Sequence, residues 1–386
     1  MSVGVAILGA GWAGAMHARA ARAAGLNLVG VAARNLATTR AFAAAHGVPL
    51  ASDDWRALVE HPDVELVVIA TPNALHEPQA LHALARGRHV LVEKPMALTL
   101  ADCAAMVRIA AAAGVVLLVG HSHSYDAPVA AARRLIASGA HGAVRMIHAL
   151  NATDFLYRPR RPEELDTVSG GGAVFNQAPH QVDIVRLLAG GMATRVRAHT
   201  GAWDRSRPTE GAYAALVDFE GGCFASLTYS GYAHFDTDAL CDWIGETGHR
   251  RDPTAYGAAR RALADAAAPE AVLRQARGYG NATANPPPPI AHEHFGFVLA
   301  CCERADLRLL PDRVEIFADG GRSTLPLPPP RPPRREVWDA FYTAITTGVM
   351  PTQTGGWGLA TMELCLAILH SAREGREIAL AHQVPA

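Results

Sequence analysis

Short apolar runs alternate with Ala-rich stretches over the first 120 residues. Continuous apolar runs of this length are typical of strands in a parallel sheet, which is buried on both faces. The stretches between them carry ordinary helix signals, such as Ser52-Asp53-Asp54 before one and Gly87 or Gly114 after others. We therefore predict an α/β domain over 1–120 with a doubly wound parallel sheet. Its strands are expected at 3–8, 27–33, 66–70, 89–92 and 115–119.

From about residue 121 the pattern changes to longer strands that have one apolar and one polar face. A helix is expected near 127–138, ahead of these strands. Two-faced strands are typical of antiparallel sheets. We predict a second, α+β domain over 121–386 with a large open, mostly antiparallel sheet. Its strands are expected at 143–151, 193–200, 212–220 and 222–230.

Two Pro-rich stretches interrupt this second domain. Residues 232–295 are rich in Asp, Arg and Ala and end near Pro286–Pro289, which predicts an insertion with a helix near 256–277. Leu325 to Arg335 is a second Pro-rich connector. Terminal helices are expected after it, over 336–374.

Composition excludes several classes of protein. The chain has 386 residues, a net charge of -1 and 18% charged residues, so nothing favours a nucleic-acid or anionic-membrane partner. No apolar run reaches about 18 residues, and the N-terminus enters a strand with no signal-peptide pattern. The six cysteines lack C-x-x-C spacing, which favours reduced thiols over a disulfide frame or a zinc site. We expect a cytoplasmic protein.

The chain contains a single lysine. Lysine and arginine together number 35, and all but Lys94 are arginines. Arginine cannot replace a group that must give up a proton, because its pKa stays above about 12. Lys94 follows an apolar strand-like run, where open α/β sheets place their chemistry. A chance survivor of the compositional bias is the alternative interpretation.

A glycine motif follows the first predicted strand. Gly9, Gly11 and Gly14 fit G-x-G-x-x-G between a strand and a helix, with Trp12 and Ala13 inside the motif. This context predicts a Rossmann domain that binds NAD or NADP through the motif and the helix N-terminus. A tight strand–helix turn without a ligand is the alternative.

The second predicted strand ends at Arg34 and Asn35, twenty positions after the motif. An NAD site usually carries Asp or Glu there, whereas Arg accommodates a 2′-phosphate. Arg34 therefore favours NADP over NAD. The alternative is an Arg34 that stacks on the adenine of plain NAD.

Three further strings complete a family pattern: Ala70-Thr71-Pro72-Asn73-Ala74-Leu75-His76, Glu93-Lys94-Pro95, and Gly170-Gly171-Gly172 through Asp183. In this order, and over essentially the whole chain, they resemble the glucose–fructose oxidoreductase and inositol dehydrogenase family (Gfo/Idh/MocA). The resemblance implies an NAD(P)-dependent dehydrogenase whose C-terminal sheet makes homo-oligomers. It also implies that cofactor contacts come from Thr71, Asn73, His76, Glu93, Lys94 and His121.

The same resemblance implies the catalytic groups. Lys94 and His180 match the lysine and histidine that act on the substrate hydroxyl in the family. Asn176 stands where the family usually has Asp, and Ala178 where it usually has Gly. An amide can orient a hydroxyl but cannot act as a base, so proton handling is expected to fall on Lys94 and His180.

Residues 120–126, 154–166 and 230–235 resemble the phthalate 4,5-dihydrodiol dehydrogenase branch, which oxidises a cyclic cis-diol to a catechol. Arg158, Arg160 and Arg161 are interpreted as groups that bind substrate carboxylates. A salt-bridge strip with Glu163, Glu164 and Asp166 is an equally good alternative. Other expected substrate contacts are His123, Tyr125, Asn176 and Gln177.

Other functions stay open. A sugar, inositol or ketone dehydrogenase of the same fold is one alternative, and an NAD-dependent glycosidase is another. His121, His123, His292 and His294 could suggest a metal, but no Cys or paired carboxylate completes a set, so we expect none. The expected partners are a small-molecule substrate and further copies of the chain.

Overall fold

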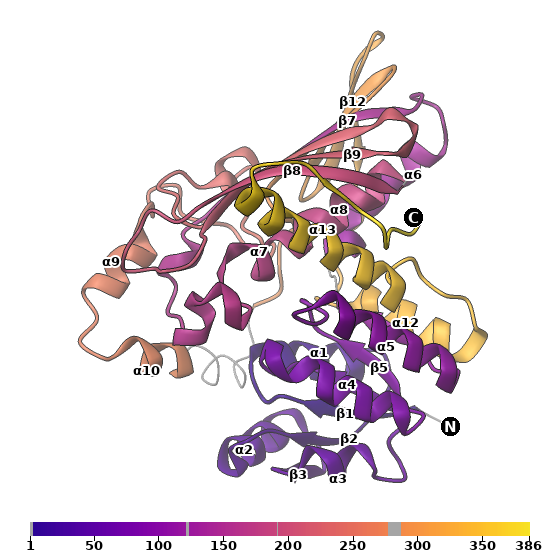
Figure 1. Ribbon diagram of the computed structural model, residues 1–386, viewed down its shortest axis with the longest axis vertical. Coiled ribbons are helices and arrows are strands. Elements are labelled where there is room, and N and C mark those ends of the chain that lie inside the picture. The colour runs from indigo at the N-terminus through magenta and orange to yellow at the C-terminus, as the bar shows by residue number, and fades with distance from the viewer. Residues whose placement is uncertain (1–2, 121–122, 191, 277–286) are drawn as a thin grey trace. The chain divides into compact units, whose positions relative to one another are not determined.

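The computed structural model describes residues 3–120, 123–190, 192–276 and 287–386 (Figure 1). The chain groups into two compact units. The first contains 1–121, 271–287 and 332–362, and the second contains 122–270, 288–331 and 363–386. A C-terminal segment that we expected in the second domain thus groups with the first unit.

The first unit is built on a six-stranded sheet in the order β3-β2-β1-β4-β5-β6, with every pair parallel. This is the strand order of dinucleotide-binding folds, so the predicted doubly wound sheet is confirmed. The strands are β1 (Gly4–Leu8), β2 (Asn27–Ala32), β3 (Leu50–Ser52), β4 (Leu66–Ile69), β5 (His89–Val92) and β6 (Leu117–Val119).

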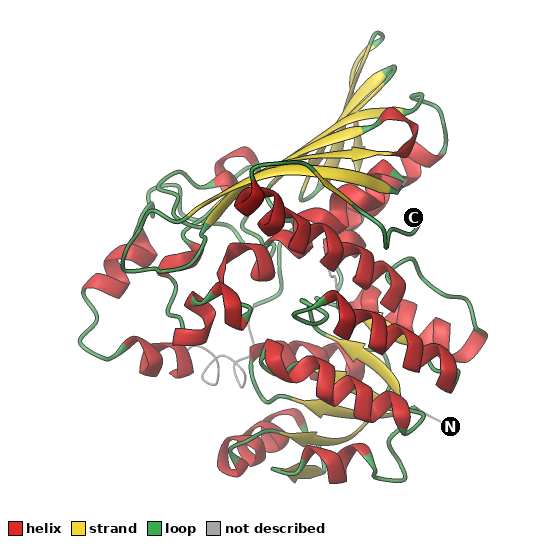
Figure 2. Ribbon diagram, in the orientation of Figure 1, coloured by secondary structure: helices red, strands yellow, loops and turns green. Residues whose placement is uncertain are grey.

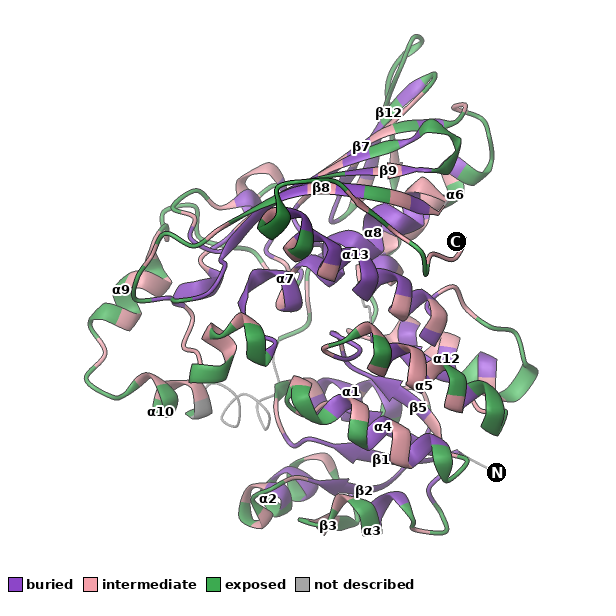
Figure 3. Ribbon diagram, in the orientation of Figure 1, coloured by how far each residue is buried: buried purple, intermediate pink, exposed green. Residues whose placement is uncertain are grey.

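The central strands of this sheet are buried along their whole length, as the continuous apolar runs require (Figure 3). The edge strand β3 was not expected, because it is short and its first residue, Leu50, is exposed. Helices of this unit include α1 (Trp12–Ala23), α2 (Leu36–His46), α3 (Trp55–Val59), α4 (His76–Ala85), α5 (Leu100–Ala113) and α12 (Arg335–Thr347).

The second unit is built on a nine-stranded sheet in the order β14-β13-β12-β11-β7-β10-β9-β8-β15. Only β7 and β10 pair in parallel, so the predicted mostly antiparallel sheet is confirmed. Its strands are β7 (Val144–Ala152), β8 (Ala193–Gly201), β9 (Ala212–Phe219), β10 (Phe224–Ser230), β11 (Phe297–Cys302), β12 (Ala305–Leu310), β13 (Arg313–Ala318), β14 (Gly321–Pro326) and β15 (Ile378–Ala379).

Helices α6 (Ala127–Ala137) and α8 (Ala178–Ala189) pack on this sheet (Figure 2). The short helix α7 (Gly172–Asn176) leads directly into α8. The long helix α13 (Gly355–Glu374) begins in the first unit and ends in the second. Side chains on strands β9 and β10 alternate between buried and more exposed positions, so one face of these strands forms core and the other stays open.

The helix expected at 256–277 is instead two helices, α9 (Ala258–Ala264) and α10 (Glu270–Gln275). Pro269 separates them, because proline has no N–H and disfavours helical backbone in the residue before it. The predicted stiff stretch at Pro286–Pro289 begins outside the described residues. Strands β11 to β14 occupy a region to which the sequence analysis assigned no element.

All six cysteines, each within the described ranges, have free thiols. In the described parts of the chain no helix combines the length and the apolar character that a membrane crossing requires.

Candidate active site

The glycine motif forms the turn between β1 and α1. Gly9 has φ +111°, and a Cβ there would lie 2.3 Å from the Ala70 carbonyl oxygen. A Cβ at Gly14 would lie 2.0 Å from the Gly9 carbonyl oxygen. These two glycines are therefore required by the turn itself and by its close packing.

Gly11 differs from its two neighbours in the motif. It is the N-cap of α1, with no side-chain cap from the described residues. A Cβ at this position would meet no described atom within 4 Å. The first turn of α1, with Trp12 half-exposed beside it, thus offers unshielded N–H groups to an anion, and the residues present fit a dinucleotide diphosphate.

Arg34 and Asn35 follow β2, and both are exposed. The Asn35 side chain accepts a hydrogen bond from the Thr38 backbone N–H at 3.1 Å, which caps α2. In the described ranges no ion pair or hydrogen bond involves the Arg34 side chain. The Arg34 guanidinium is thus available at the position where a 2′-phosphate would be bound.

His76 joins the loop after β4 to the loop that carries Lys94. Its Nε2 lies 2.9 Å from the Thr71 carbonyl oxygen, and its Nδ1 lies 2.8 Å from the Pro95 carbonyl oxygen. Burial lowers the pKa of His76, which favours the neutral ring. The Thr71 hydroxyl donates to the Gln79 side chain at 2.7 Å, and Asn73 begins the short 3₁₀ turn that leads into α4. His76 therefore contacts one residue of the loop after β4, Thr71, and one residue of the Lys94 loop, Pro95.

Glu93 lies directly before Lys94 and is buried. Its Oε1 lies 2.9 Å from His17 Nε2 and 3.3 Å from Arg334 Nη2. Sequence reasoning missed both partners, because His17 lies outside the glycine motif on α1 and Arg334 lies in a Pro-rich connector.

In the second unit the structure brings His123 and His180 together. Their ring centroids are 4.6 Å apart and cross nearly perpendicularly. The His123 Nδ1 lies 2.7 Å from an Asp126 carboxylate oxygen. Phe295 packs against both histidines, at 5.2 and 4.8 Å between centroids. Sequence reasoning missed Phe295, although His294 beside it had been noted.

Asn176 ends α7, and Gln177 follows it as the N-cap of α8. The Asn176 side-chain amide donates to the Gly172 carbonyl oxygen at 2.8 Å. The buried carboxylate of Glu210 accepts from the Val174 N–H at 3.0 Å and occupies the space where a Cβ of Gly172 would lie. Glu210, which the sequence analysis did not single out, thus holds the backbone that carries Asn176.

Tyr125 lies in the 3₁₀ turn that also contains His123. Burial raises the pKa of its hydroxyl, followed by the nearby charge of Asp183. The hydroxyl finds no hydrogen-bond partner among the described residues.

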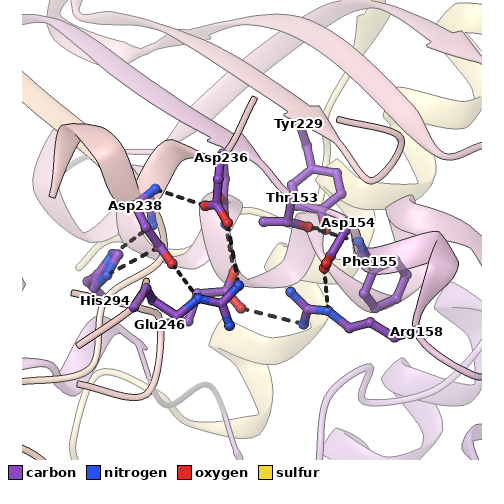
Figure 4. A network of polar contacts seen from close by, with 12 residues as sticks. Thr153, Asp154, Phe155, Arg158, Tyr229, Asp236, Asp238, Glu246 and His294 are labelled. Carbon is purple, nitrogen blue, oxygen red and sulfur yellow. Dashed lines mark hydrogen bonds and ion pairs between the residues drawn. The ribbon is translucent and has the colours of Figure 1, made fainter. Parts of the chain in front are cut away.

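Arg158 belongs to a polar network with acidic residues from three segments (Figure 4). Its guanidinium lies 3.0 Å from Asp154 and 3.8 Å from Glu246. Burial alone would lower the pKa of Arg158, but Glu246 and Asp154 outweigh it and raise the pKa. In the same network, burial and then the charges of Asp236 and Glu246 raise the pKa of Asp238 to about 7.

Arg160 and Arg161 make different contacts. Arg160 donates to the Phe155 carbonyl oxygen at 2.7 Å, and its guanidinium lies over the Phe155 ring. Arg161 lies 3.2 Å from Glu163 and 3.5 Å from Glu164. These contacts match the salt-bridge alternative for Arg161 and in part for Arg160, whose Nη1 is 3.9 Å from Glu164.

Of the remaining histidines that the sequence singled out, those within the described residues do not form a metal site. His121 lies outside the described residues. His292 and His294 contact the carbonyl oxygens of Pro328 and Ile244. Among the described residues there is no group of three or more His, Cys, Asp or Glu with the geometry to hold a metal ion.

Comparison with known proteins places the chain among oxidoreductases. Residues 3–121 match the model of an oxidoreductase family with an NAD-binding Rossmann fold, and residues 129–250 match the GFO/IDH/MocA C-terminal domain. The chain is 44% identical over 336 residues to 1-carboxy-3-chloro-3,4-dihydroxycyclohexa-1,5-diene dehydrogenase of Comamonas testosteroni, with 86% of this chain and 83% of the relative covered.

More distant relatives include trans-1,2-dihydrobenzene-1,2-diol dehydrogenase of Oryctolagus cuniculus, 30% identical over 53% of this chain and 60% of the relative. A crystal structure from Bordetella bronchiseptica RB50 is 35% identical with a TM-score of 0.92, and 98% of this chain and all of that chain are covered. Levoglucosan dehydrogenase in complex with NADH and levoglucosan has a TM-score of 0.77 at 19% identity, over 98% of this chain and 100% of that chain, which is a likeness of fold alone.

Proposed function

Because the chain belongs to the GFO/IDH/MocA family and is an NAD(P)-dependent oxidoreductase, we propose that its substrate is a carboxylated cyclic cis-diol, which it oxidises to a catechol. The observation that carries this proposal is the 44% identity, over most of both chains, to a dehydrogenase named for a carboxylated dihydroxycyclohexadiene. The local resemblance over 120–126 and 154–166 supports it independently.

The reaction removes a hydride from a carbinol carbon and a proton from its hydroxyl. The nicotinamide, when bound, accepts the hydride. The resulting hydroxydienone tautomerises to the catechol, and this aromatisation favours product. Lys94 and His180 are proposed to share the hydroxyl proton, since an amine and an imidazole can each take up and release a proton.

Asn176 is proposed to orient the substrate by hydrogen bonding, because an amide cannot take a proton. His123 is proposed to assist His180, and the pairing of His123 with Asp126 supports this role. Phe295 supplies an apolar ring against both imidazoles, a surface that suits the apolar face of an unsaturated carbocycle.

The cofactor is proposed to be NADP. Arg34 is exposed at the end of β2 and supplies the positive charge that a 2′-phosphate requires.

Recognition of the substrate carboxylate is proposed for Arg158 and Arg160, with Arg161 at the margin. The contacts of these side chains with Asp154, Glu246 and Phe155 already orient two of the guanidinium groups. A carboxylate bound there would add a charge-assisted pair to groups that are held in place.

The decisive experiment measures reduced nicotinamide by absorbance, with NAD and NADP, on a panel of cis-diols, inositols and aldoses. We expect stoichiometric reduction with a carboxylated cis-diol and a rise in KM for that diol, but not for a neutral diol, in Arg158→Gln. Reduction only with sugars would leave the family assignment and overturn the diol proposal. Bond cleavage of a glycoside without net reduction would support the glycosidase alternative.

We also propose that the chain forms homo-oligomers through the open face of the nine-stranded sheet. Leu216 and Phe224 are exposed on this face at 58% and 44%. The strand register places them on the same side, since Phe224 pairs with Asp218, two positions along from Leu216. Exposed apolar side chains that gather on one face are typical of an interface.

A further inference from the structure

The residue before the single lysine belongs to a buried ionic cluster that the proposed mechanism does not use. Glu93 is only 7% exposed, and its Oε1 contacts both His17 and Arg334. All three side chains are nearly inaccessible to solvent. A buried carboxylate is stable only when it is paired, so this cluster decides the charge next to Lys94.

Arg334 links two strand ends. While one Nη atom contacts Glu93, the other donates to the Gly120 carbonyl oxygen at 3.3 Å. The Gly120 N–H in turn donates to the Val92 carbonyl oxygen at 2.7 Å. Arg334 itself has φ +68°, a left-handed conformation that is unusual for a non-glycine residue and that begins α12. The guanidinium is therefore held at the carboxyl ends of β5 and β6.

The charges of Glu93 and Arg334 follow from these contacts. His17 Nε2 donates its N–H to Glu93, whereas His17 Nδ1 has no hydrogen-bond partner among the described residues. Burial alone would raise the pKa of Glu93, but Arg334 and then His17 outweigh it and hold the pKa well below its usual range. Glu93 is thus a carboxylate, and Arg334 is the permanent cation that compensates it.

Lys94 is the next residue, and its charge acts on Glu93 as well. The groups that face this part of the loop are Glu93 itself, His17 from α1, His76 from α4 and Arg334 at the start of α12. Burial lowers the pKa of His76, so it favours the neutral ring. Without Arg334, the ammonium of Lys94 would become the main cation available to Glu93.

We propose that Arg334 is a positioning residue for Lys94: it occupies Glu93, so that the ammonium is not captured by the adjacent carboxylate and can release its proton. The consequence for turnover rests on the proposed function, but the electrostatic effect on Lys94 does not. Removal of a cation from beside a carboxylate–lysine pair favours the charged form of the lysine, because the repulsion between the two cations is lost.

The single lysine allows a direct test. Protein grown with ¹³Cε-lysine gives one lysine side-chain signal, which belongs to Lys94. Its titration midpoint is measured by NMR in wild type, Arg334→Met and Arg334→Gln. We expect the midpoint to rise by about one pH unit in both variants, the scale of a close charge–charge effect. The acidic limb of the kcat/KM profile should move up by the same amount.

Arg335→Met is the matched control. Arg335 is adjacent in the chain, but its side chain pairs with Asp339 at 2.7 Å and with the Ala23 carbonyl oxygen. The titration midpoint of Lys94 in Arg335→Met should equal that in wild type. Adding Glu93→Gln to Arg334→Met removes both charges and should bring the midpoint back toward the wild-type value.

An unchanged midpoint in folded Arg334→Met would overturn the proposal. If both Arg334 variants fail to fold, Glu93→Gln alone decides: the midpoint must fall, and a constant value would overturn the proposal. A shifted midpoint in a protein that oxidises no alcohol would leave the electrostatic role standing and refute the proposed function. An enzyme that oxidises the diol but whose Lys94 midpoint does not change in the Arg334 variants would keep the proposed function and refute the electrostatic role.

Discussion

At the scale of single residues, Lys94 is the strongest prediction of the sequence, and the structure places it in a loop that His76 links, through the Pro95 carbonyl oxygen, to Thr71 in the loop after β4. We expect Lys94→Arg to bind cofactor normally but to lose turnover by roughly two to four orders of magnitude, since arginine keeps its charge and cannot exchange a proton. Stopped-flow hydride transfer, with cofactor titration as the control, measures this. Turnover close to wild type would show that only the charge matters.

We expect Arg34 to decide the choice between NADP and NAD. Replacement by Ala should weaken NADP binding by about 1.5–3 kcal/mol, the range for a hydrogen bond to a charged group, and leave NAD binding nearly unchanged. Calorimetry with both dinucleotides measures the two affinities. An equal loss for both would instead place Arg34 against the adenine.

Asp238 makes stability depend on pH. Its pKa is raised from 3.8 to about 7, so the folded protein holds a proton that the unfolded chain releases between these values. The stabilising contribution is complete below about pH 4 and is lost as the pH rises through 7. Asp238→Asn imitates the protonated form, and it should raise the unfolding free energy at pH 8 by roughly 1–3 kcal/mol and much less at pH 5.

Urea unfolding at both pH values tests this, with the exposed Asp319→Asn as the control. A gain that is the same at pH 5 and pH 8 would mean that Asp238 is already ionised at pH 5.

Residues inside short motifs could be predicted from the sequence, whereas their partners could not. His123 and His180 are 57 positions apart, yet each lies in a recognisable string, and the structure brings them together. Phe295 and Arg334 reach their clusters only through the folded chain. No local pattern of sequence marks such a residue, because its role depends on contacts that form between distant segments.

At the scale of elements, two glycines of the turn between β1 and α1 are expected to serve different purposes: Gly14 allows close packing, and Gly11 allows the dinucleotide to approach. A Cβ at Gly14 would collide with the Gly9 carbonyl, so Gly14→Ala should destabilise the fold by about 1–3 kcal/mol. A Cβ at Gly11 meets no described atom within 4 Å, so the free energy of unfolding of Gly11→Ala should lie within about 0.5 kcal/mol of that of wild type. Its dinucleotide affinity should nevertheless fall tenfold or more, which corresponds to about 1.4 kcal/mol.

Thermal melting with and without dinucleotide distinguishes the two glycine variants. Equal dinucleotide affinity in Gly11→Ala and wild type would mean that the diphosphate does not approach this turn.

Elements with strong periodicity were predicted near their observed bounds, such as β5 at His89–Val92 and α6 at Ala127–Ala137. The break at Pro269 was missed because the Ala-rich flanks have high helix propensity on both sides. Strand β3 was missed because three partly exposed residues carry no burial signal; the strand forms by pairing with β2 and packing against α2.

At the scale of the whole molecule, the open sheet face makes self-association testable. We expect wild type to be a dimer or tetramer by light scattering, and Leu216→Asp or Phe224→Asp to shift it to monomer, because a charge there would be buried without a partner. Val168→Asp is the control, since Val168 is 91% exposed and belongs to a 3₁₀ turn and not to a strand. An unchanged mass in both sheet variants would place any interface elsewhere.

The two ends of the nine-stranded sheet limit how such assembly can proceed. One outer strand is the two-residue strand β15, which pairs with β8, and the other, β14, is largely exposed and contains Arg322, Ser323 and Thr324 before Pro326. Short, polar and proline-terminated borders oppose the addition of further strands from another molecule. Growth by strand addition, the route to fibrils, is thereby discouraged at both borders.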